Sequence, residues 1–215
     1  MVPNGVSIVT TTLNERENIE KLISSIKNVL QCLEHEIIVV DDNSQDGTIQ
    51  IANRLADVAV TKTREGQSKG LLYGMKMAKY PIIITIDADL ENEPADIPKL
   101  IQKINEFDIV VASRTKLPRI SEKIASKTLG KIIGVTDTFS NFRAYRKETI
   151  SEFSLRGGET FGAEFLVIAK KKGFRIGEIR YDPPPRRKNP RIGGKTKANL
   201  RIIWALIKAL TIYLI

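Results

Sequence analysis

Pro81-Ile-Ile-Ile-Thr-Ile-Asp-Ala-Asp-Leu90 joins an apolar run to two carboxylates, and Glu91 comes next in the chain. Residues 82–86 are apolar or β-branched and show no alternating polar face, which predicts a strand buried on both sides of a sheet. Asp87 and Asp89 follow at the point where this strand must end. In open α/β sheets, ligands bind outside the carboxyl ends of the strands. The stretch therefore predicts an α/β fold and a candidate binding site at the end of this strand.

The three acidic side chains at this strand end suggest a metal site. Asp87, Asp89 and Glu91 alternate along the chain, so an extended backbone would direct all three to one side. Hard oxygen ligands of this kind suit Mg²⁺ or Mn²⁺, which keep water ligands and share the phosphates of a nucleotide. The alternative is a helix N-terminus, with Asp89 as its cap and the other carboxylates favourable to the helix dipole. The stretch alone leaves both interpretations open.

The composition is that of a basic globular protein of 215 residues, for which one domain with a sizeable core is expected. The 34 Lys and Arg outnumber the 25 Asp and Glu, giving a net charge of +9. Such a surplus favours an anionic partner: nucleic acid, an anionic membrane surface or a phosphorylated substrate. A single cysteine, Cys32, excludes an intrachain disulfide. The first residues lack a secretory signal, so a cytoplasmic location is expected.

Apolar runs and helical periodicity alternate along the first half of the chain. The predicted strands are residues 6–11, 36–40, 58–61, 82–86 and 108–112. This alternation predicts a parallel sheet built from right-handed βαβ units. Polar loops follow three of these strands, at residues 11–15, 41–46 and 87–91, and we expect them to meet at one edge of the sheet.

Two common phosphate-binding motifs are excluded. No Gly-x-Gly-x-x-Gly follows the first strand, which argues against the usual dinucleotide site. Gly194-Lys195-Thr196 resembles the end of a P-loop, but the leading glycine is missing and a proline-rich segment precedes it.

The second half of the chain is more basic and less regular. A helix is predicted at residues 121–133, where Lys123, Lys127 and Lys131 recur at four-residue spacing and are interpreted as a solvated face. A strand-like stretch at 138–145, a helix at 161–171 and a strand at 175–181 follow. The prolines and arginines of residues 183–191 predict an extended basic loop.

The last element, residues 197–215, has an amphipathic pattern. Lys197, Arg201, Lys208 and Thr211 form one narrow stripe on a helix, and the rest of its surface is mainly apolar. Its apolar part is shorter than the roughly 20 residues that a membrane-spanning helix needs. A helix in the membrane interface and a helix packed on the domain or on a second subunit both fit this pattern. We therefore divide the chain into a domain at 1–196 and an amphipathic helix at 197–215.

Five segments, in order over nearly the whole chain, resemble those of family 2 glycosyltransferases with the GT-A fold, most of all the dolichyl-phosphate mannose synthase group. They are residues 11–19 (TTLNERENI), 40–48 (VDDNSQDGT), 87–91 (DADLE), 137–143 (DTFSNFR) and 191–197 (RIGGKTK). Thr11, Leu13 and Asn141 stand where that group has Pro, Tyr and Gly. The resemblance implies a nucleotide-sugar donor, which is expected to be GDP-mannose or a UDP-hexose.

The resemblance implies an α/β GT-A fold, a Rossmann-like sandwich with a mostly parallel central sheet flanked by helices, plus a C-terminal amphipathic helix. It implies an inverting glycosyltransferase that moves a hexose, with mannose expected, from a nucleoside diphosphate sugar to a polyprenyl (dolichyl) phosphate. Such an acceptor oxygen is already ionised, so it needs no general base. One alternative is transfer to a glycan or lipid hydroxyl, for which Asp137, Glu159 and Glu164 are candidate bases. Another, from a different class, is a basic nucleic-acid-binding module.

The resemblance also assigns roles to individual residues. The catalytic set is Asp89, Arg114, Arg143 and Arg191. The nucleotide-sugar set is Thr11, Leu13, Asn14, Glu15, Asp41, Asp42, Lys69, Asp87 and Ala88. The acceptor-phosphate set is Ser140, Arg143, Arg191, Lys195 and Lys197. The metal set, for Mg²⁺ or Mn²⁺, is Asp87, Asp89 and Glu91.

The expected partners are a nucleoside diphosphate sugar, a polyprenyl phosphate and the cytoplasmic face of a membrane, on which the protein would be peripheral. No nucleic acid is expected, because the acidic strand end would repel it without a metal. The sequence leaves the oligomeric state open.

Overall fold

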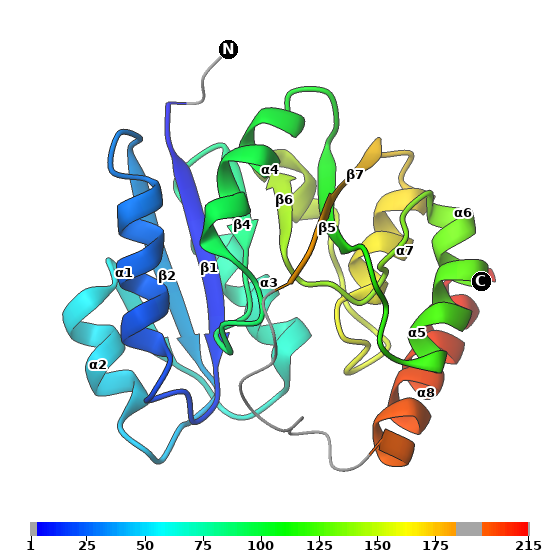
Figure 1. Cartoon of the computed structure of the whole chain (residues 1–215), viewed down its shortest axis with the longest axis horizontal. Helices are drawn as coiled ribbons and strands as arrows, with labels where there is room; N and C mark the ends of the chain where they lie inside the picture. The colour runs from blue at the N-terminus through cyan, green and yellow to red at the C-terminus, as the bar shows by residue number, and fades with distance from the viewer. Residues whose placement is uncertain (1–3, 184–194, 215) are drawn as a thin grey trace.

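The computed structural model describes residues 4–183 and 195–214, and within them seven strands form one central sheet (Figure 1). The strands are β1 (Val6–Thr12), β2 (His35–Asp41), β3 (Val58–Thr61), β4 (Ile82–Thr85), β5 (Ile109–Arg114), β6 (Arg143–Arg146) and β7 (Ile176–Tyr181). Their order across the sheet is β3-β2-β1-β4-β6-β5-β7. The predicted strands of the first half are therefore all present, and most boundaries agree within two residues.

The sheet is parallel except at β6, which confirms the predicted mostly parallel sheet. β1 pairs in parallel with β2 and β4, and β5 with β7. β6 runs antiparallel between β4 and β5, where Arg143 lies opposite Thr85 and Val111. The predicted strand at 138–145 is shorter in the structure, because residues 137–142 form a loop that enters β6 from the carboxyl edge of its neighbours.

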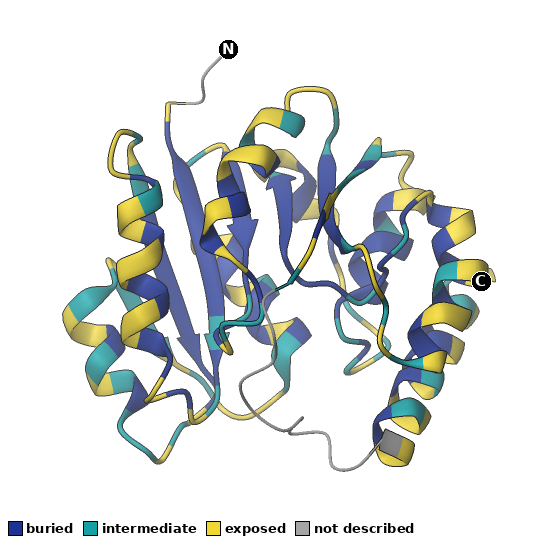
Figure 2. Ribbon diagram, in the orientation of Figure 1, coloured by how far each residue is buried: buried dark blue, intermediate teal, exposed yellow. Residues whose placement is uncertain are grey.

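Helices cover both faces of the sheet in a three-layer sandwich. One face packs against α1 (Ile19–Val29), α2 (Thr48–Leu55), η1 (Pro94–Asp96) and α4 (Ile97–Lys103). The other packs against α3 (Gln67–Met77), α5 (Ile120–Ala125), η2 (Ser126–Gly130), α6 (Lys131–Ile133), η3 (Lys147–Glu152), α7 (Ala163–Lys171) and α8 (Lys195–Leu214). Neighbouring strand residues such as Ile8 and Val9 enter opposite cores, because successive side chains of a strand alternate between the faces. The central strands β1, β2 and β4 are accordingly buried along almost their whole length, whereas the edge strands β3 and β7 are partly exposed (Figure 2).

The C-terminal helix α8 is packed on the domain. It lies against α5 and α7 (Figure 1), and Leu206 and Ala209 belong to the same core as the strands. Leu200 and Trp204 remain exposed on its outer side. In the described part of the chain, no helix combines the length and apolar character needed to cross a membrane.

Candidate active site

The carboxyl ends of β1, β2 and β4 meet at one edge of the sheet, as expected. The chain leaves β1 toward β2 and β3 and returns on the other side as β4, so β1 and β4 flank the point where the strand order reverses. Such switch points hold the ligands of open α/β sheets. A cavity of about 840 Å³ opens here. Ten of the predicted site residues line it: Thr11, Leu13, Glu15, Asp42, Asp87, Ala88, Asp89, Glu91, Arg114 and Ser140.

Other predicted site residues do not line this cavity. The Asp41 carboxylate is fully buried and accepts hydrogen bonds from Thr12 Oγ1 at 2.7 Å and from Ser44. Asn14 Oδ1 accepts the backbone N–H of the neighbouring loop. Lys69 is exposed and pairs with Glu65 one helical turn away. These side chains shape the loops around the cavity instead of facing it.

Of three further residues of the acceptor-phosphate prediction, the structure describes only Lys197 with its side chain. Lys197 is exposed near the start of α8 and is not among the lining residues. Arg191 and the side chain of Lys195 lie outside the part of the chain that the structure describes.

Arg143 is placed differently from the prediction that it contacts a phosphate. It opens a central strand with both faces covered, and its side chain is fully buried. Its guanidinium donates to the carbonyl oxygens of Gly162 at 2.8 Å and Thr138 at 3.0 Å. Arg143 therefore ties together the two loops that contain residues 138 and 162. A side chain at position 162 would collide with Asn141. The hydrogen bond from Arg143 to the carbonyl oxygen of residue 162 therefore depends on a glycine at this position.

The acidic stretch after β4 turns instead of continuing in the extended form expected from its alternation. Asp89 Oδ1 accepts the backbone N–H of Glu91 at 3.0 Å, and Leu90 between them has a left-handed backbone with φ of 61°. Such a conformation is costly for a leucine and is typical of functional loops. This short-range hydrogen bond from a backbone N–H to an aspartate side chain explains the turn.

The carboxylates of this turn fit a divalent cation chemically, although they do not form a ready-made metal cage. Within the described residues, no group of three His, Cys, Asp or Glu side chains converges on one metal position. Burial and the neighbouring carboxylates of Asp89 and Glu91 raise the pKa of Asp87 to about 7. A bound cation would offset this repulsion, and Mg²⁺ typically takes only one or two protein carboxylates and completes its shell with water and substrate phosphates.

Near the carboxyl ends of β1 and β2, the Asp42 carboxylate is held on the cavity wall. Its Oδ1 accepts from Lys62 Nζ at 2.5 Å and from the backbone N–H of Glu65 at 3.2 Å. Gly66 N–H reaches the other oxygen at 3.4 Å. The loop after β3 thereby orients Asp42 toward the cavity beside β1 and β2.

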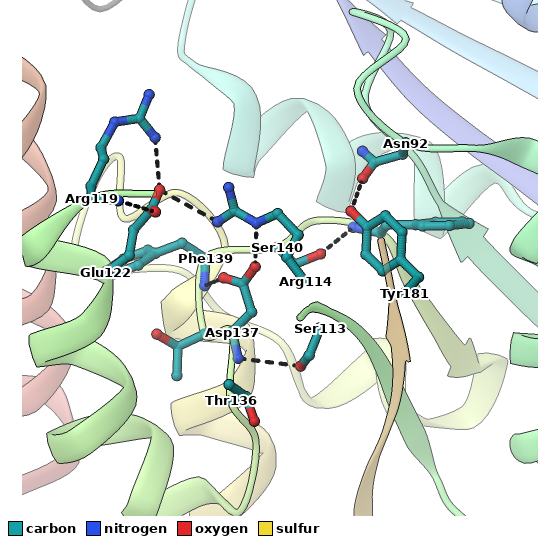
Figure 3. A network of polar contacts seen from close by, with 12 residues as sticks. Asn92, Ser113, Arg114, Arg119, Glu122, Thr136, Asp137, Phe139, Ser140 and Tyr181 are labelled. Atoms are coloured by element: carbon teal, nitrogen blue, oxygen red, sulfur yellow. Dashed lines mark hydrogen bonds and ion pairs between the residues drawn. The ribbon is translucent and has the colours of Figure 1, made fainter. Parts of the chain in front are cut away.

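Two arginines line another part of the cavity and share a buried carboxylate (Figure 3). Arg114 donates from Nε to Asp137 at 2.6 Å and lies 3.4 Å from Glu122. Arg119 pairs with the same Glu122 at 2.7 Å. Burial alone would lower the pKa of Arg114, but Asp137 and Glu122 outweigh it and raise the pKa. Each guanidinium has five N–H donors, so these ion pairs leave others for an anion.

The three candidate bases are all engaged in hydrogen bonds. Asp137 accepts from Arg114, and Glu164 accepts the backbone N–H groups of Arg156 and Gly157. Glu159 lines the cavity but also accepts from Ser68 Oγ at 2.6 Å.

Several cavity residues were missed by the sequence reasoning. They are Lys62, Gln67, Asn92, Arg119, Glu122 and Tyr181. Lys62 and Tyr181 could have been found, because each lies at the carboxyl end of a predicted strand. Arg119 and Glu122 do not lie at the end of a predicted strand, so no sequence feature indicated that they belong to the site.

Comparisons with known proteins agree with this architecture. Residues 7–174 match the model of glycosyl transferase family 2. The chain is 35% identical to dolichol-phosphate mannosyltransferase of Pyrococcus furiosus, over 94% of this chain and 64% of that protein. It is 32% identical to undecaprenyl-phosphate 4-deoxy-4-formamido-L-arabinose transferase of Pseudomonas fluorescens, over 67% of this chain and 48% of that protein.

Solved structures show the same fold at lower identity. Glucosyl-3-phosphoglycerate synthase of Mycobacterium tuberculosis, in complex with Mn²⁺, UDP and glucosyl-3-phosphoglycerate, superposes with a TM-score of 0.78 at 20% identity, covering 96% of this chain and 80% of that one. The predicted GT-A fold is thereby confirmed.

The fold defines an α/β domain of the GT-A type, and the chain belongs to glycosyl transferase family 2. It spans less than two thirds of the length of the curated relatives described above.

Proposed function

We propose that this chain is the catalytic part of an inverting glycosyltransferase that moves a hexose from a nucleoside diphosphate sugar to a polyprenyl phosphate. The observation that carries the proposal is one cavity lined by the carboxylates after β4 and by the guanidinium groups of Arg114 and Arg119. Such a cavity suits two phosphorylated ligands, one brought with a cation and one bound by arginine. The two curated relatives, named for transfer involving polyprenyl phosphates, support the same acceptor class.

The chain's own residues would divide the work along the cavity. Asp42 would accept hydrogen bonds from the base or ribose of the donor, and Asp87, Asp89 and Glu91 would hold Mg²⁺ or Mn²⁺. When bound, the cation would neutralise charge that develops on the leaving diphosphate. Arg114 and Arg119 would orient the acceptor phosphate.

In the proposed reaction, a phosphate oxygen bonds to the anomeric carbon as the carbon–oxygen bond to the diphosphate breaks, with inversion. This oxygen is ionised at neutral pH and has no proton to lose, so no base is required. That agrees with Asp137 and Glu164 being engaged by Arg114 and by backbone N–H groups. Transfer to a hydroxyl would instead require a carboxylate to act as the general base. Glu159 lines the cavity, but it already accepts hydrogen bonds from Ser68 and Phe161.

A transfer assay tests the proposal. GDP-mannose, UDP-glucose and UDP-N-acetylglucosamine are each supplied with Mn²⁺ and either a polyprenyl phosphate or a saccharide acceptor. Formation of a glycosyl phosphate lipid is expected, and product from the saccharide alone would contradict the acceptor class. A ligand that binds the folded state raises the melting temperature. Comparing the stabilisation by GDP with that by UDP, each with Mn²⁺, therefore identifies the nucleobase of the donor.

We also propose that the protein is peripheral on a membrane through the exposed side chains of α5 and α8, called here the α5–α8 surface. Its members are Ile120, Lys123, Ile124, Lys197, Leu200, Arg201, Trp204 and Ile207. Ser121 Oγ donates to Asn199 across the two helices at 2.7 Å, so the exposed residues on either side form one surface. Glu122 is the only carboxylate of these helices, and it is buried.

Anionic lipid fits this surface better than a second copy of the chain, because cations would face cations in a symmetric pair. Exposed apolar side chains among lysines and arginines are typical of interfacial helices. The surface also continues to the cavity, since Ile202 of α8 and Arg119 just before α5 line it. The anionic lipids of the cytoplasmic leaflet suit this charge.

The single tryptophan, Trp204, reports on this contact directly. Its fluorescence is expected to shift to the blue with phosphatidylglycerol vesicles at low salt and not with phosphatidylcholine alone. Arg201→Glu should weaken the shift, whereas Arg54→Glu on α2 is the matched control and should not. An unchanged spectrum, or a dimer that forms through α8 in sedimentation, would contradict membrane docking.

A further inference from the structure

Asp87 is held by two neutral amides. Its Oδ1 accepts a hydrogen bond from Gln67 Nε2 at 2.6 Å, and its Oδ2 accepts from Asn92 Nδ2 at 3.4 Å. Gln67 is the first residue of α3, whereas Asn92 follows the acidic turn. Both line the cavity with Asp87. Each carboxylate oxygen therefore has a donor from a different part of the chain.

Within the described residues, no lysine or arginine lies at ion-pair distance from Asp87. Two other carboxylates that line or border the cavity are paired: Asp42 with Lys62 at 2.5 Å and Asp137 with Arg114 at 2.6 Å. An amide orients a carboxylate by hydrogen bonding but leaves its negative charge in place, whereas an ammonium or guanidinium cancels it. Asp87 thus combines a fixed orientation with the absence of a cationic partner in the described part of the chain.

Tyr181 fixes the direction of the Asn92 amide. The Tyr181 hydroxyl donates to Asn92 Oδ1 at 2.5 Å (Figure 3), so the Asn92 nitrogen is the end that faces Asp87. The reverse orientation would set the amide oxygen against a carboxylate oxygen. Tyr181 is itself held at the end of β7 and packs edge-on against Phe142.

We propose that Gln67 and Asn92, with Tyr181 behind Asn92, are positioning residues that hold the Asp87 carboxylate ready for a divalent cation. The inference rests on the proposed function, in which Asp87 is a metal ligand. Groups that hydrogen-bond to a ligand orient it toward the metal, and their loss typically lowers metal affinity about 10–100-fold. Charge-neutral donors suit this task because they do not compete with the cation.

Titration of the purified chain with Mn²⁺, followed by the electron paramagnetic resonance of free Mn²⁺, tests this inference. It is carried out with Mn²⁺ alone and with GDP or UDP added. Gln67→Met keeps the length of the side chain but removes the donor, and Asn92→Leu does the same at the second oxygen. Each variant is expected to bind Mn²⁺ about tenfold or more weakly. Tyr181→Phe keeps the ring and should weaken binding less.

Two controls separate positioning from folding. Gln50→Met, on the exposed side of α2, makes the same substitution away from the cavity and should bind Mn²⁺ like the original protein. Melting temperatures in EDTA show whether each variant is folded without metal. If Gln67→Met is unstable, the Mn²⁺ affinity of Tyr181→Phe still tests the positioning role.

The outcomes separate this inference from the proposed function. If the original protein bound no Mn²⁺ with or without nucleotide, the metal-dependent function itself would be overturned. If it bound Mn²⁺ and the folded Gln67→Met, Asn92→Leu and Tyr181→Phe variants bound it within about twofold of the same affinity, the positioning role would be overturned. Weakened binding in the variants, with the control unchanged, supports it.

Discussion

Two parts of the cavity treat charge in opposite ways. After β4, Asp87 has no cationic partner among the described residues and is held by the neutral amides of Gln67 and Asn92. Beside β5, the cationic Arg114 is held by buried carboxylates, among them Asp137. The first arrangement leaves a negative charge for a cation that arrives from solution. The second neutralises the cation internally and uses its remaining donors for an anion.

This difference has an energetic meaning. A buried ion pair is expensive to break, because the partner that remains is an uncompensated charge. A carboxylate repelled by its neighbours costs stability until a cation binds it. We therefore expect the arginine end to contribute to folding and the carboxylate end to contribute to ligand binding, and the following substitutions test that division.

Asp89→Asn should have the largest effect on activity, because it replaces a charged carboxylate of the proposed cation site by a neutral amide. We expect transfer to fall at least about 100-fold. Asp89 is exposed, so the melting temperature in EDTA should not change. Near-normal turnover with Mn²⁺ present would contradict the metal role of this turn.

Asp137→Asn should have the largest effect on stability. It leaves the guanidinium of Arg114 without its closest partner, and the free energy of unfolding should fall by about 3–5 kcal/mol in urea denaturation. Asp87→Asn, measured in EDTA, is the matched substitution and should cost no stability, because it removes a repelled charge. If the two variants lost the same free energy of unfolding, the proposed division between an arginine end that stabilises the fold and a carboxylate end that binds ligand would be wrong.

Arg119→Lys should have a moderate effect confined to the acceptor. A lysine keeps the charge but loses the planar fork of donors, so the KM for the phosphate acceptor should rise about tenfold. The affinity for the nucleotide, measured by calorimetry, should stay the same. A parallel loss of nucleotide affinity would show that Arg119 belongs to the donor end, and Arg54→Lys on the exposed side of α2 serves as the control.

Lys69→Ala should have the smallest effect. The resemblance assigns Lys69 to the nucleotide site, but its ammonium makes an exposed ion pair with Glu65, which lies in the loop before α3. Exposed pairs of this kind contribute little. Nucleotide affinity should stay within about twofold, and a tenfold loss would favour the sequence-based role.

Much of the candidate site could be predicted from local sequence, because strand ends carry it. Asp42, Asp87 and Arg114 each come at or just after the carboxyl end of a strand, where parallel topology brings side chains together. Arg143 shows the limit of the same reasoning. Its motif predicted a phosphate contact, but burial on a central strand directs its guanidinium to backbone carbonyls.

The sequence by itself determined the family, the α/β fold, the succession of most strands along the chain and the edge of the sheet at which the site lies. These follow from hydrophobic periodicity and from motifs that are local in the chain. Only the tertiary structure decided which side chains face the cavity and how their charges are balanced. The pairs Gln67–Asp87, Arg114–Asp137 and Tyr181–Asn92 join residues 20 to 89 positions apart. No periodicity encodes such contacts, because they depend on how helices and loops from distant parts of the chain pack at the same sheet edge.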